Sequence, residues 1–290
     1  MTYNSMLRDD ALADEVHIVT GGGSGIGRCV AHELAGLGAH VVITGRKPEK
    51  LDAVLGEIAE DGGSATSLSF DIRDEEAVRG AVSEIVTANG RIHGLVNNAG
   101  GQFPAPAATI SKKGFDAVVA TNLTGGFLMM REVFTQSMAD HGGAVVNMAA
   151  NMWNGMPGMA HSGAARAGMV NLTKTTAFEW APFGVRVNCV APGWIATSGL
   201  DTYEGPTKAL IGQLADHVPL RRLGEEAEVS AVIAFLLSPA AAYVTGVTIP
   251  IDGGAPLGTA LFPPVKGLGN QPFEGFHRAV KPKILGGGDR

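Results

Sequence analysis

The sequence predicts an α/β fold, in which a single domain is built on a doubly wound parallel sheet of about seven strands with helices on both faces. Short apolar runs alternate with helical patterns along residues 1–254, as they do in parallel sheets covered by helices. No linker interrupts this pattern. Hydrophobic residues make up 45% of the chain and charged residues 17%, a composition that excludes a disordered protein.

The strands are predicted from short runs of apolar and β-branched residues. They cover residues 16–20, 39–44, 67–70, 93–96, 144–148, 185–190 and 248–251. In an open parallel sheet, ligands bind beyond the carboxyl ends of the strands, where the strand order reverses. We therefore look for functional residues directly after these runs.

The helices are predicted from apolar residues spaced three and four apart. They cover about 26–37, a stretch through Ala53 and Ile58, a stretch that begins after the N-cap Asp74, and about 112–139, 159–180 and 226–237. Asn122 lies inside the helix over 112–139, where asparagine is unfavourable. We expect it to be functional there, by holding a water molecule or a kink in the backbone.

Residues 255–290 form a Gly/Pro-rich C-terminal extension to this domain. Glycine and proline account for seven and five of its residues, which is typical of irregular structure. Four apolar side chains could dock it on the body or on a neighbouring subunit, so order and disorder both remain open: Leu261, Phe262, Phe273 and Phe276.

A glycine-rich loop, TGGGSGIG at 20–27, follows the first predicted strand and opens the first helix. Its glycines, Gly21, Gly25 and Gly27, let the backbone approach a pyrophosphate, and the helix N-terminus offers free N–H groups. Ser24 and Ile26 lie between them and are expected to contact the same group. The strand–loop–helix context favours a dinucleotide site over a merely flexible loop.

The second predicted strand ends in Thr44-Gly45-Arg46-Lys47, without an acid. Sites that prefer the unphosphorylated ribose place an acid here, whereas Arg46 can form a fork with a 2′-phosphate. We therefore expect NADP(H) to be preferred over NAD(H), the alternative being that Arg46 and Lys47 only solvate a loop. Asp71 could accept a hydrogen bond from the adenine amino group, or simply start a helix.

These motifs resemble the short-chain dehydrogenase/reductase family. They are TGGGSGIG at 20–27, Asp71, NNAG at 97–100, Asn122, PGWIAT at 192–197 and IDGG at 251–254. The resemblance implies a Rossmann-type fold and a homotetramer or homodimer. It also implies that the cofactor's adenine and ribose side is contacted by Asp71, Ile72, Asn98, Ala99 and Gly100, and its nicotinamide side by Pro192, Gly193, Ile195 and Thr197.

The sequence departs from the family's Ser–Tyr–x-x-x–Lys set. Ser162 stands at the tyrosine position, Arg166 at the lysine position, and Ala149 or Ala150 at the serine position, so that only Asn122 of the usual four remains. A serine hydroxyl is a poor acid, and arginine stays charged at working pH. The ordinary mechanism of carbonyl reduction is therefore not expected here.

Enoyl reduction makes other demands, because charge develops on a thioester oxygen and needs fixed donors aimed at it. Residues 97–103, 115–127 and 161–168 look like the peroxisomal trans-2-enoyl-CoA reductases and, more loosely, the 2,4-dienoyl-CoA reductases. In the former, a tyrosine eight positions after the Ser162 equivalent is the proton group, and here that position is Val170. The predicted catalytic residues are Asn122, Ser162 and Arg166, with His161 as a possible proton donor; Arg166 is also expected to contact the cofactor.

We therefore expect an NADPH-dependent reductase of a trans-2-enoyl-CoA. The alternatives are a ketone, 3-oxoacyl or 2,4-dienoyl-CoA reductase on the same fold, and an NADP-binding sensor or scaffold that has lost catalysis. Residues 198–218 are predicted to form a mobile lid, in which Tyr203 is a weak candidate for a replacement phenol. An apolar wall for the acyl chain, or ordinary packing, is expected of Met148, Met152, Trp153, Met156 and Met159.

Other classes of function are unfavourable. The net charge is −6 and no segment concentrates Lys and Arg, so we expect no nucleic-acid partner. No run of 18 apolar residues and no secretory signal occurs, which predicts a cytoplasmic protein without a membrane span. Cys29 and Cys189 are expected to be buried free thiols, and no metal site is predicted.

Overall fold

Seven parallel strands form one sheet in the order β3-β2-β1-β4-β5-β6-β7, which confirms the predicted fold class. The computed structural model describes residues 8–258, 263–265 and 270–287. The strands are β1 Val16–Thr20, β2 His40–Gly45, β3 Ser64–Ser69, β4 Gly94–Asn97, β5 Gly143–Met148, β6 Val185–Pro192 and β7 Thr248–Ile251. The order reverses at β1, which pairs with β2 on one side and with β4 on the other.

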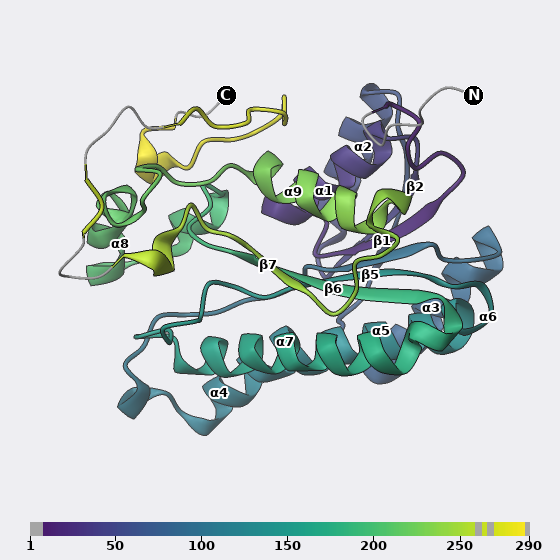
Figure 1. The fold of residues 1–290 in the computed structure, drawn as a ribbon, viewed down its shortest axis with the longest axis horizontal. Helices are drawn as coiled ribbons and strands as arrows, with labels where there is room; N and C mark the ends of the chain where they lie inside the picture. The colour runs from purple at the N-terminus through teal and green to yellow at the C-terminus, as the bar shows by residue number, and fades with distance from the viewer. Residues whose placement is uncertain (1–7, 259–262, 266–269, 288–290) are drawn as a thin grey trace.

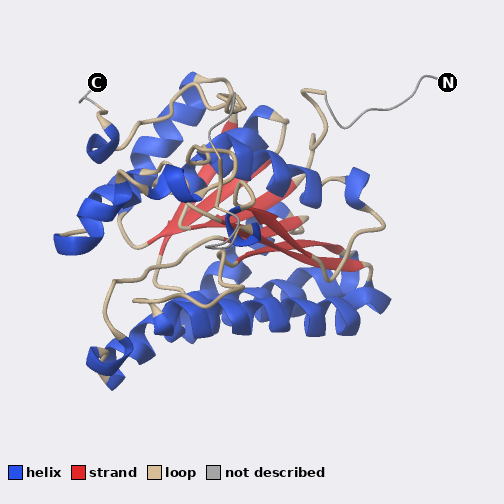
Figure 2. Cartoon of the chain, turned by 60° about the vertical axis from the view of Figure 1, so that its left-hand side comes forward, coloured by secondary structure: helices blue, strands red, loops and turns tan. Residues whose placement is uncertain are grey.

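Helices cover both faces of the sheet, as Figures 1 and 2 show. One layer holds α1 Gly25–Gly36, α2 Pro48–Glu60 and α9 Glu226–Leu237. The other holds α3 Glu75–Asn89, α4 Lys112–Val119, α5 Gly125–Val133, α6 Ala139–His141 and α7 Ala160–Trp180. Within the described ranges, no helix is long and apolar enough to cross a bilayer.

Two apolar cores separate the sheet from these layers. Because side chains alternate along a strand, Val19 and Ile43 pack toward α1, α2 and α9, whereas Ile18 and Val42 pack toward α3, α5 and α7. These strand residues are almost completely buried. The sheet is thus fixed from both sides, which holds the loops at its carboxyl edge in place.

The helix predicted over residues 112–139 is present, but its hydrogen-bond pattern is not regular. Two π-helical turns, at Ala120–Thr124 and Phe134–Met138, separate α4, α5 and α6. The wider π turn inserts an extra residue into the helical ladder and re-aims the side chains around it. The helix therefore covers the predicted range, and the predicted kink at Asn122 takes the form of a π turn whose asparagine contacts a distant loop. A smaller difference concerns β3, which begins three residues before the predicted start at 67.

The predicted lid, residues 198–218, contains a 3₁₀ turn at Ser198–Thr202, α8 at Gly205–Ile211 and a second 3₁₀ turn at Leu214–His217. The described part of the C-terminal extension docks on the body (Figure 1). Phe276 is buried there beside Cys29 and Ala227, while Phe273 is exposed. Leu261 and Phe262 lie outside the described residues. Cys29 and Cys189 are both buried free thiols, as predicted.

Candidate active site

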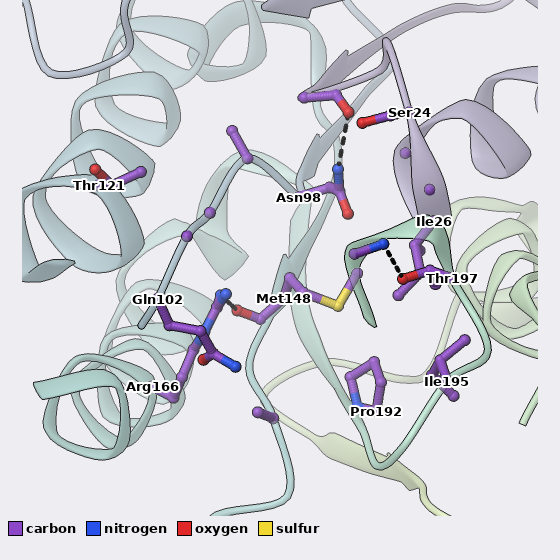
Figure 3. A pocket seen from close by; sticks show the side chains of 18 of the residues that line it. Ser24, Ile26, Asn98, Gln102, Thr121, Met148, Arg166, Pro192, Ile195 and Thr197 are labelled. Carbon is purple, nitrogen blue, oxygen red and sulfur yellow. Dashed lines mark hydrogen bonds between the residues drawn. The ribbon is translucent and has the colours of Figure 1, made fainter. Parts of the chain in front are cut away.

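A cleft of about 1020 Å³ lies beyond the carboxyl ends of the strands. Loops that follow β1 to β6 supply its walls, and Figure 3 shows the side chains that point into it. Every residue that the sequence predicted for the cofactor lines this cleft: Gly21, Ser24, Gly25, Ile26, Gly27, Arg46, Asp71, Ile72, Asn98, Ala99, Gly100, Arg166, Pro192, Gly193, Ile195 and Thr197. The strand reversal therefore coincides with the cleft, as expected for this architecture.

The glycine-rich loop is shaped for close backbone approach. Gly21 and Gly25 have φ values of +68° and +55°, which side chains rarely adopt. A Cβ on Gly27 would lie 2.3 Å from the carbonyl oxygen of Gly21. Ser24, the N-cap of α1, makes no hydrogen bond to the helix through its side chain. The hydroxyl and the free N–H groups of a 12-residue helix thus fit a pyrophosphate group.

The loop after β4 is tied to the loop after β1. Asn98 Nδ2 donates to the carbonyl oxygen of Thr20 at 2.9 Å, and Thr20 Oγ1 accepts the backbone N–H groups of Asn98 and Ala99, each at 3.0 Å. Figure 3 shows the Asn98 side chain turned toward the glycine-rich loop. Asn98 therefore fixes the shape of the cradle that a dinucleotide would enter.

Four basic residues line the end of the cleft near β2 and β3: Arg46, Lys47, Lys50 and Arg73. Arg73 donates to Asp71 from its Nε at 2.9 Å, and this hydrogen bond lowers the pKa of Asp71 to about 2. The carboxylate is thus balanced by a cation that the sequence interpretation did not consider. The remaining positive charge at this end suits a phosphate-bearing ribose.

Asn122 lies at the π turn and is buried. Its Nδ2 donates to the carbonyl oxygen of Gly101 at 2.8 Å, and its Oδ1 accepts the Gly101 N–H at 2.9 Å. Both ends of the amide are therefore used by one residue of the loop after β4. The structure shows Asn122 fixing this loop rather than lining the cleft itself, where its neighbour Thr121 is found.

Arg166 extends from the second turn of α7 into the cleft (Figure 3). Its Nη1 donates to the carbonyl oxygen of Met148 at 2.5 Å. Its Nη2 lies against Gly100, where an added Cβ would be 2.6 Å away. The Nε atom is buried without a hydrogen-bond partner, and no described carboxylate forms an ion pair with this arginine.

This burial has an electrostatic consequence. Loss of hydration disfavours the charged form and lowers the pKa of Arg166 to about 10. The guanidinium is therefore still protonated at neutral pH. An uncompensated cation at the base of a cleft attracts an anion or an oxygen atom on which negative charge develops.

Ser162 and His161 do not line the cleft. Ser162 is fully buried, and its Oγ donates to Gln102 Oε1 at 2.6 Å. His161 is also fully buried: its Nδ1 accepts the Ser162 N–H at 2.8 Å, and its ring packs edge-on against Phe103. Of the four predicted catalytic residues, the structure therefore places Arg166 in the cleft and the others behind its wall.

Gln102 is the residue that the sequence interpretation missed. It lines the cleft, accepts the hydrogen bond from Ser162, and donates from Nε2 to Tyr203 Oη at 3.0 Å. Its position directly after the NNAGG stretch is the one signal in the sequence that points to it. The side-chain amide of Gln102 thus links α7 to the lid through two hydrogen bonds.

The expected apolar wall is present in part. Met148, Met156 and Met159 line the cleft. Met152 instead packs against a small buried cluster behind it, and Trp153 is 44% exposed and does not line the cleft. The lid contributes further lining through Leu200, Tyr203 and His217, among others. In the described ranges, no group of His, Cys, Asp or Glu side chains is arranged to hold a metal ion.

Comparison with known proteins identifies the chain's family. Residues 21–256 match a family model described as enoyl-(acyl carrier protein) reductase, which takes in the glycine-rich loop, the NNAG stretch and the PGWIAT stretch of the cleft. The chain belongs to the short-chain dehydrogenase/reductase family. Members of this short-chain dehydrogenase/reductase family bind a nicotinamide cofactor on such a sheet.

Two short-chain dehydrogenase/reductase relatives carry names of dienoyl-CoA reductases. A probable 2,4-dienoyl-CoA reductase of Bacillus subtilis is 38% identical over 245 residues, covering 82% of this chain and 94% of the relative. A peroxisomal 2,4-dienoyl-CoA reductase of Pongo abelii is 38% identical over 270 residues, covering 92% of this chain and 91% of the relative.

A solved structure of the same family is more similar in sequence. It is a citronellol catabolism dehydrogenase of Pseudomonas aeruginosa PAO1, 59% identical, with a TM-score of 0.78. The alignment covers 87% of this chain and 99% of that chain.

Proposed function

We propose that this oxidoreductase uses NADPH to reduce a carbon–carbon double bond conjugated to the thioester carbonyl of an acyl-CoA. The observation that carries the proposal is Arg166, a cation that points into the cleft without a carboxylate partner. The relatives named 2,4-dienoyl-CoA reductases support the same class of substrate.

The chemistry follows from where charge develops. The nicotinamide cofactor, when bound, supplies a hydride to the far end of the conjugated system. The electron pair then moves to the thioester oxygen, where the buried guanidinium of Arg166 can stabilise the negative charge. Ser162 is unsuited to protonate an alkoxide, because its hydroxyl is buried and donates to Gln102.

NADPH is proposed as the cofactor because of the charge at the ribose end of the cleft. Arg46 and Lys47 line that end, and Arg73 neutralises Asp71. A 2′-phosphate would meet cations there rather than an acid. A change of Arg46 is therefore expected to weaken binding of NADPH far more than binding of NADH.

A second candidate is suggested by the solved structure that is 59% identical, since its title names citronellol catabolism and a dehydrogenase. Oxidation of an alcohol needs a base that accepts the hydroxyl proton. The position of the family's tyrosine holds Ser162, so this reaction is less well supported. A third candidate, an NADP-binding sensor, differs from both because it binds NADPH without turnover.

One assay set separates these candidates. The protein is incubated with NADPH and trans-2-enoyl-CoAs, 2,4-dienoyl-CoAs or 3-oxoacyl-CoAs, and with NADP⁺ and citronellol, while the NADPH absorbance is followed. We expect turnover of the enoyl or dienoyl substrates. Turnover of 3-oxoacyl-CoA or citronellol alone would contradict the proposal, and tight binding of NADPH with no turnover would favour the sensor.

The role of Arg166 is tested in the same assay. Arg166→Met removes the charge at similar volume, and loss of one donor to a developing oxyanion costs roughly 100- to 1000-fold in kcat. Arg79→Met is the matched control, because Arg79 is exposed on α3 and pairs only with a residue of its own helix. An Arg166→Met variant that kept its kcat would remove the main support for the proposal.

A further inference from the structure

The reduction proposed above needs a proton as well as a hydride, and the predicted proton groups do not reach the cleft. Ser162 and His161 are fully buried and absent from the cleft lining. The proton of Ser162 is engaged with Gln102, and the His161 ring lies behind Phe103. The proton donor must therefore come from another element.

Tyr203 presents a phenol to the cleft from the lid. The sequence has three tyrosines, and among the described residues Tyr203 alone of them lines the cleft, since Tyr243 is fully exposed elsewhere. Tyr203 is half-buried, so that one side of its ring faces the cleft and water can still reach it. A phenol can act as a general acid when its oxygen is held in place and the resulting phenolate is stabilised.

A hydrogen-bonded chain holds this phenol. Ser162 Oγ donates to Gln102 Oε1 at 2.6 Å, and Gln102 Nε2 donates to Tyr203 Oη at 3.0 Å. Because the phenol oxygen accepts this bond, its own proton remains available to a substrate. The same Gln102 N–H group would stabilise the phenolate after the proton has left.

The hydrogen-bonded chain starts from the same loop that the Arg166 guanidinium contacts. Gln102 lies two residues after Gly100, against which the Arg166 guanidinium packs. Gln102 and Arg166 both line the same cleft. A thioester oxygen at Arg166 would therefore lie near the Gln102 side of the cleft, where Tyr203 is hydrogen-bonded.

The lid itself is tied down at Asp201, two residues before Tyr203. Asp201 accepts the backbone N–H groups of Lys283 and Ile284, at 3.1 and 3.0 Å, from the C-terminal extension. Thr197 Oγ1 accepts the Gly199 N–H at 3.2 Å and so caps the turn before Tyr203. The phenol is thus positioned by the lid, the extension and the loop after β4 together.

We propose that Tyr203 is the proton donor of the reduction and that Gln102 and Ser162 position it. After hydride addition to the conjugated carbon, the electron pair of the double bond resides on the thioester enolate. The Tyr203 O–H bond breaks and its proton forms the new C–H bond of the product. Water then reprotonates the phenolate, which it can reach because Tyr203 is only half-buried. Gln102 and Ser162 act through the phenol and transfer no proton to the substrate.

This inference rests on the proposed function, and its test uses paired variants on whichever substrate the wild-type protein reduces. Tyr203→Phe keeps the ring and removes the proton, whereas Tyr243→Phe makes the same change on the exposed surface. We expect Tyr203→Phe to lower kcat by about 100-fold or more, with an unchanged Kd for NADPH. We expect Tyr243→Phe to leave both values unchanged.

Two positioning variants sharpen the test. Gln102→Ala should lower kcat about 10-fold, and Ser162→Ala should lower it by less, because the Ser162 hydroxyl acts on Tyr203 through Gln102. Normal kcat in Tyr203→Phe, or a loss in Ser162→Ala larger than in Tyr203→Phe, would overturn the assignment. Failure of the proposed function is distinguishable, because the wild-type protein itself would then not reduce an enoyl-CoA or dienoyl-CoA, whereas failure of this inference would leave that turnover intact in Tyr203→Phe as well.

Discussion

At the scale of single residues, Gly27 marks the closest backbone contact of the phosphate loop. A Cβ there would lie 2.3 Å from the Gly21 carbonyl oxygen and 2.4 Å from Asn98 Nδ2. Gly27→Ala should therefore displace the loop, lower the free energy of unfolding by about 1–3 kcal/mol and raise the Kd for NADPH at least 10-fold. Thermal unfolding and a fluorescence titration measure both effects.

Gly36→Ala is the matched control, since Gly36 ends the same helix, is exposed, and would place its Cβ in open space. Replacing a helical glycine by alanine should leave stability equal or raise it by about 0.4–1 kcal/mol. If both variants bound NADPH with equal Kd values, the close approach at Gly27 would have no role in binding the cofactor.

Glu226 lies close to the same loop, and its burial makes ionisation of its carboxyl group unfavourable. It is 6% exposed in the first turn of α9, and burial raises its pKa from 4.5 to about 7. The folded protein therefore holds a proton on this carboxyl that the unfolded chain releases at lower pH. The free energy of unfolding should fall as pH rises from 4.5 through 7, by about 3 kcal/mol at most.

Glu226→Gln should remove that slope, so that the variant is more stable than the wild-type protein at pH 8 and similar to it near pH 4.5. Denaturant unfolding at several pH values measures this difference. Glu49→Gln, on the exposed start of α2, should not change the slope. Parallel curves for Glu226→Gln and the wild-type protein would mean that Glu226 is already ionised without cost.

The residue scale also shows where sequence interpretation reached its limit. The cofactor residues could be predicted because local motifs place them directly after strands. Ser162 was assigned to catalysis from its alignment with a tyrosine, but its short side chain reaches only Gln102. No local pattern indicates that Gln102 would stand between α7 and the lid. Its hydrogen bond with Ser162 spans 60 positions of the sequence, and its hydrogen bond with Tyr203 spans 101.

At the scale of elements, the kink at Asn122 and the lid over residues 198–218 were predicted, but the π turn at Ala120–Thr124 and the short helices within the lid were not. The turn depends on the two hydrogen bonds between Asn122 and Gly101, a contact across 21 residues. The composition of the C-terminal extension left its order open, because glycine and proline content does not report on docking. Its anchoring depends on single side chains rather than on a periodic pattern.

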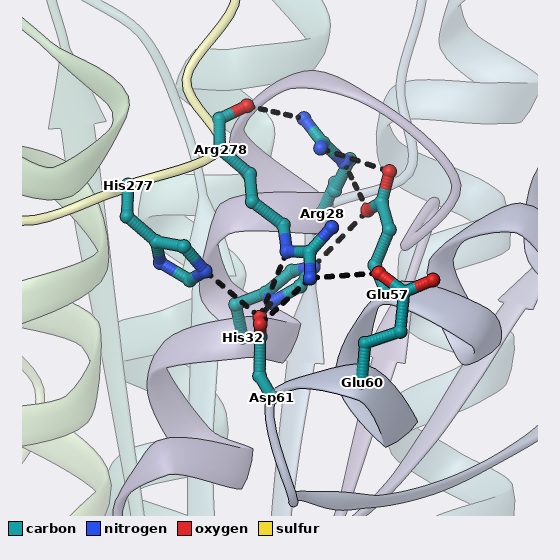
Figure 4. A network of polar contacts seen from close by, with 7 residues as sticks. All are labelled: Arg28, His32, Glu57, Glu60, Asp61, His277 and Arg278. Carbon is teal, nitrogen blue, oxygen red and sulfur yellow. Dashed lines mark hydrogen bonds and ion pairs between the residues drawn. The ribbon is translucent and has the colours of Figure 1, made fainter.

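Those anchors lie on α1 and α2. Arg278 donates to Asp61 at 2.9 and 2.7 Å and to Glu60 at 2.9 Å, and it holds the pKa of Asp61 at about 2 (Figure 4). Arg28 lies over the Phe276 ring, 5.0 Å from its centroid, and donates to the Arg278 carbonyl oxygen. The extension thus links the helices beside the phosphate loop to the lid.

This link predicts a role for Asp201 in catalysis. Asp201→Ala removes both acceptors that hold Lys283 and Ile284, so the lid should open more often. We expect kcat/KM for the acyl substrate to fall about 5- to 10-fold, about 1 kcal/mol, with an unchanged Kd for NADPH. Hydrogen exchange of residues 198–217 should become faster.

Asp52→Ala, on the exposed face of α2, is the control for this change and should leave kinetics and exchange unchanged. If Asp201→Ala exchanged at the wild-type rate in the lid and kept kcat/KM, the extension would not hold the lid in place. A truncation after Arg278 gives an independent check, because it removes Lys283 and Ile284, which donate to Asp201, and retains the contacts with α1 and α2.

At the scale of the whole molecule, the alternation of strands and helices was sufficient to predict the sheet and the edge at which ligands gather. It could do so because the central strands are short, mostly apolar and buried on both faces, as Val41, Val42 and Ile43 of β2 illustrate. The expected homodimer or homotetramer stays a prediction. The cleft unites residues from the first loop to the extension, including Pro256, so cofactor binding should raise the Tm of the entire domain.

The central claim is that hydride is added to a carbon–carbon double bond and not to a carbonyl. NADPH that carries deuterium at the transferable position, reacted with 2-enoyl-CoA and 2,4-dienoyl-CoA, tests it most directly by mass spectrometry and NMR of the product. The account predicts deuterium on carbon 3 of the product of the first substrate, or carbon 5 of the product of the second, with the thioester carbonyl intact. Absence of deuterium from both products, together with deuterium on the oxygen-bearing carbon of the alcohol formed in a parallel reaction with 3-oxoacyl-CoA, would contradict it.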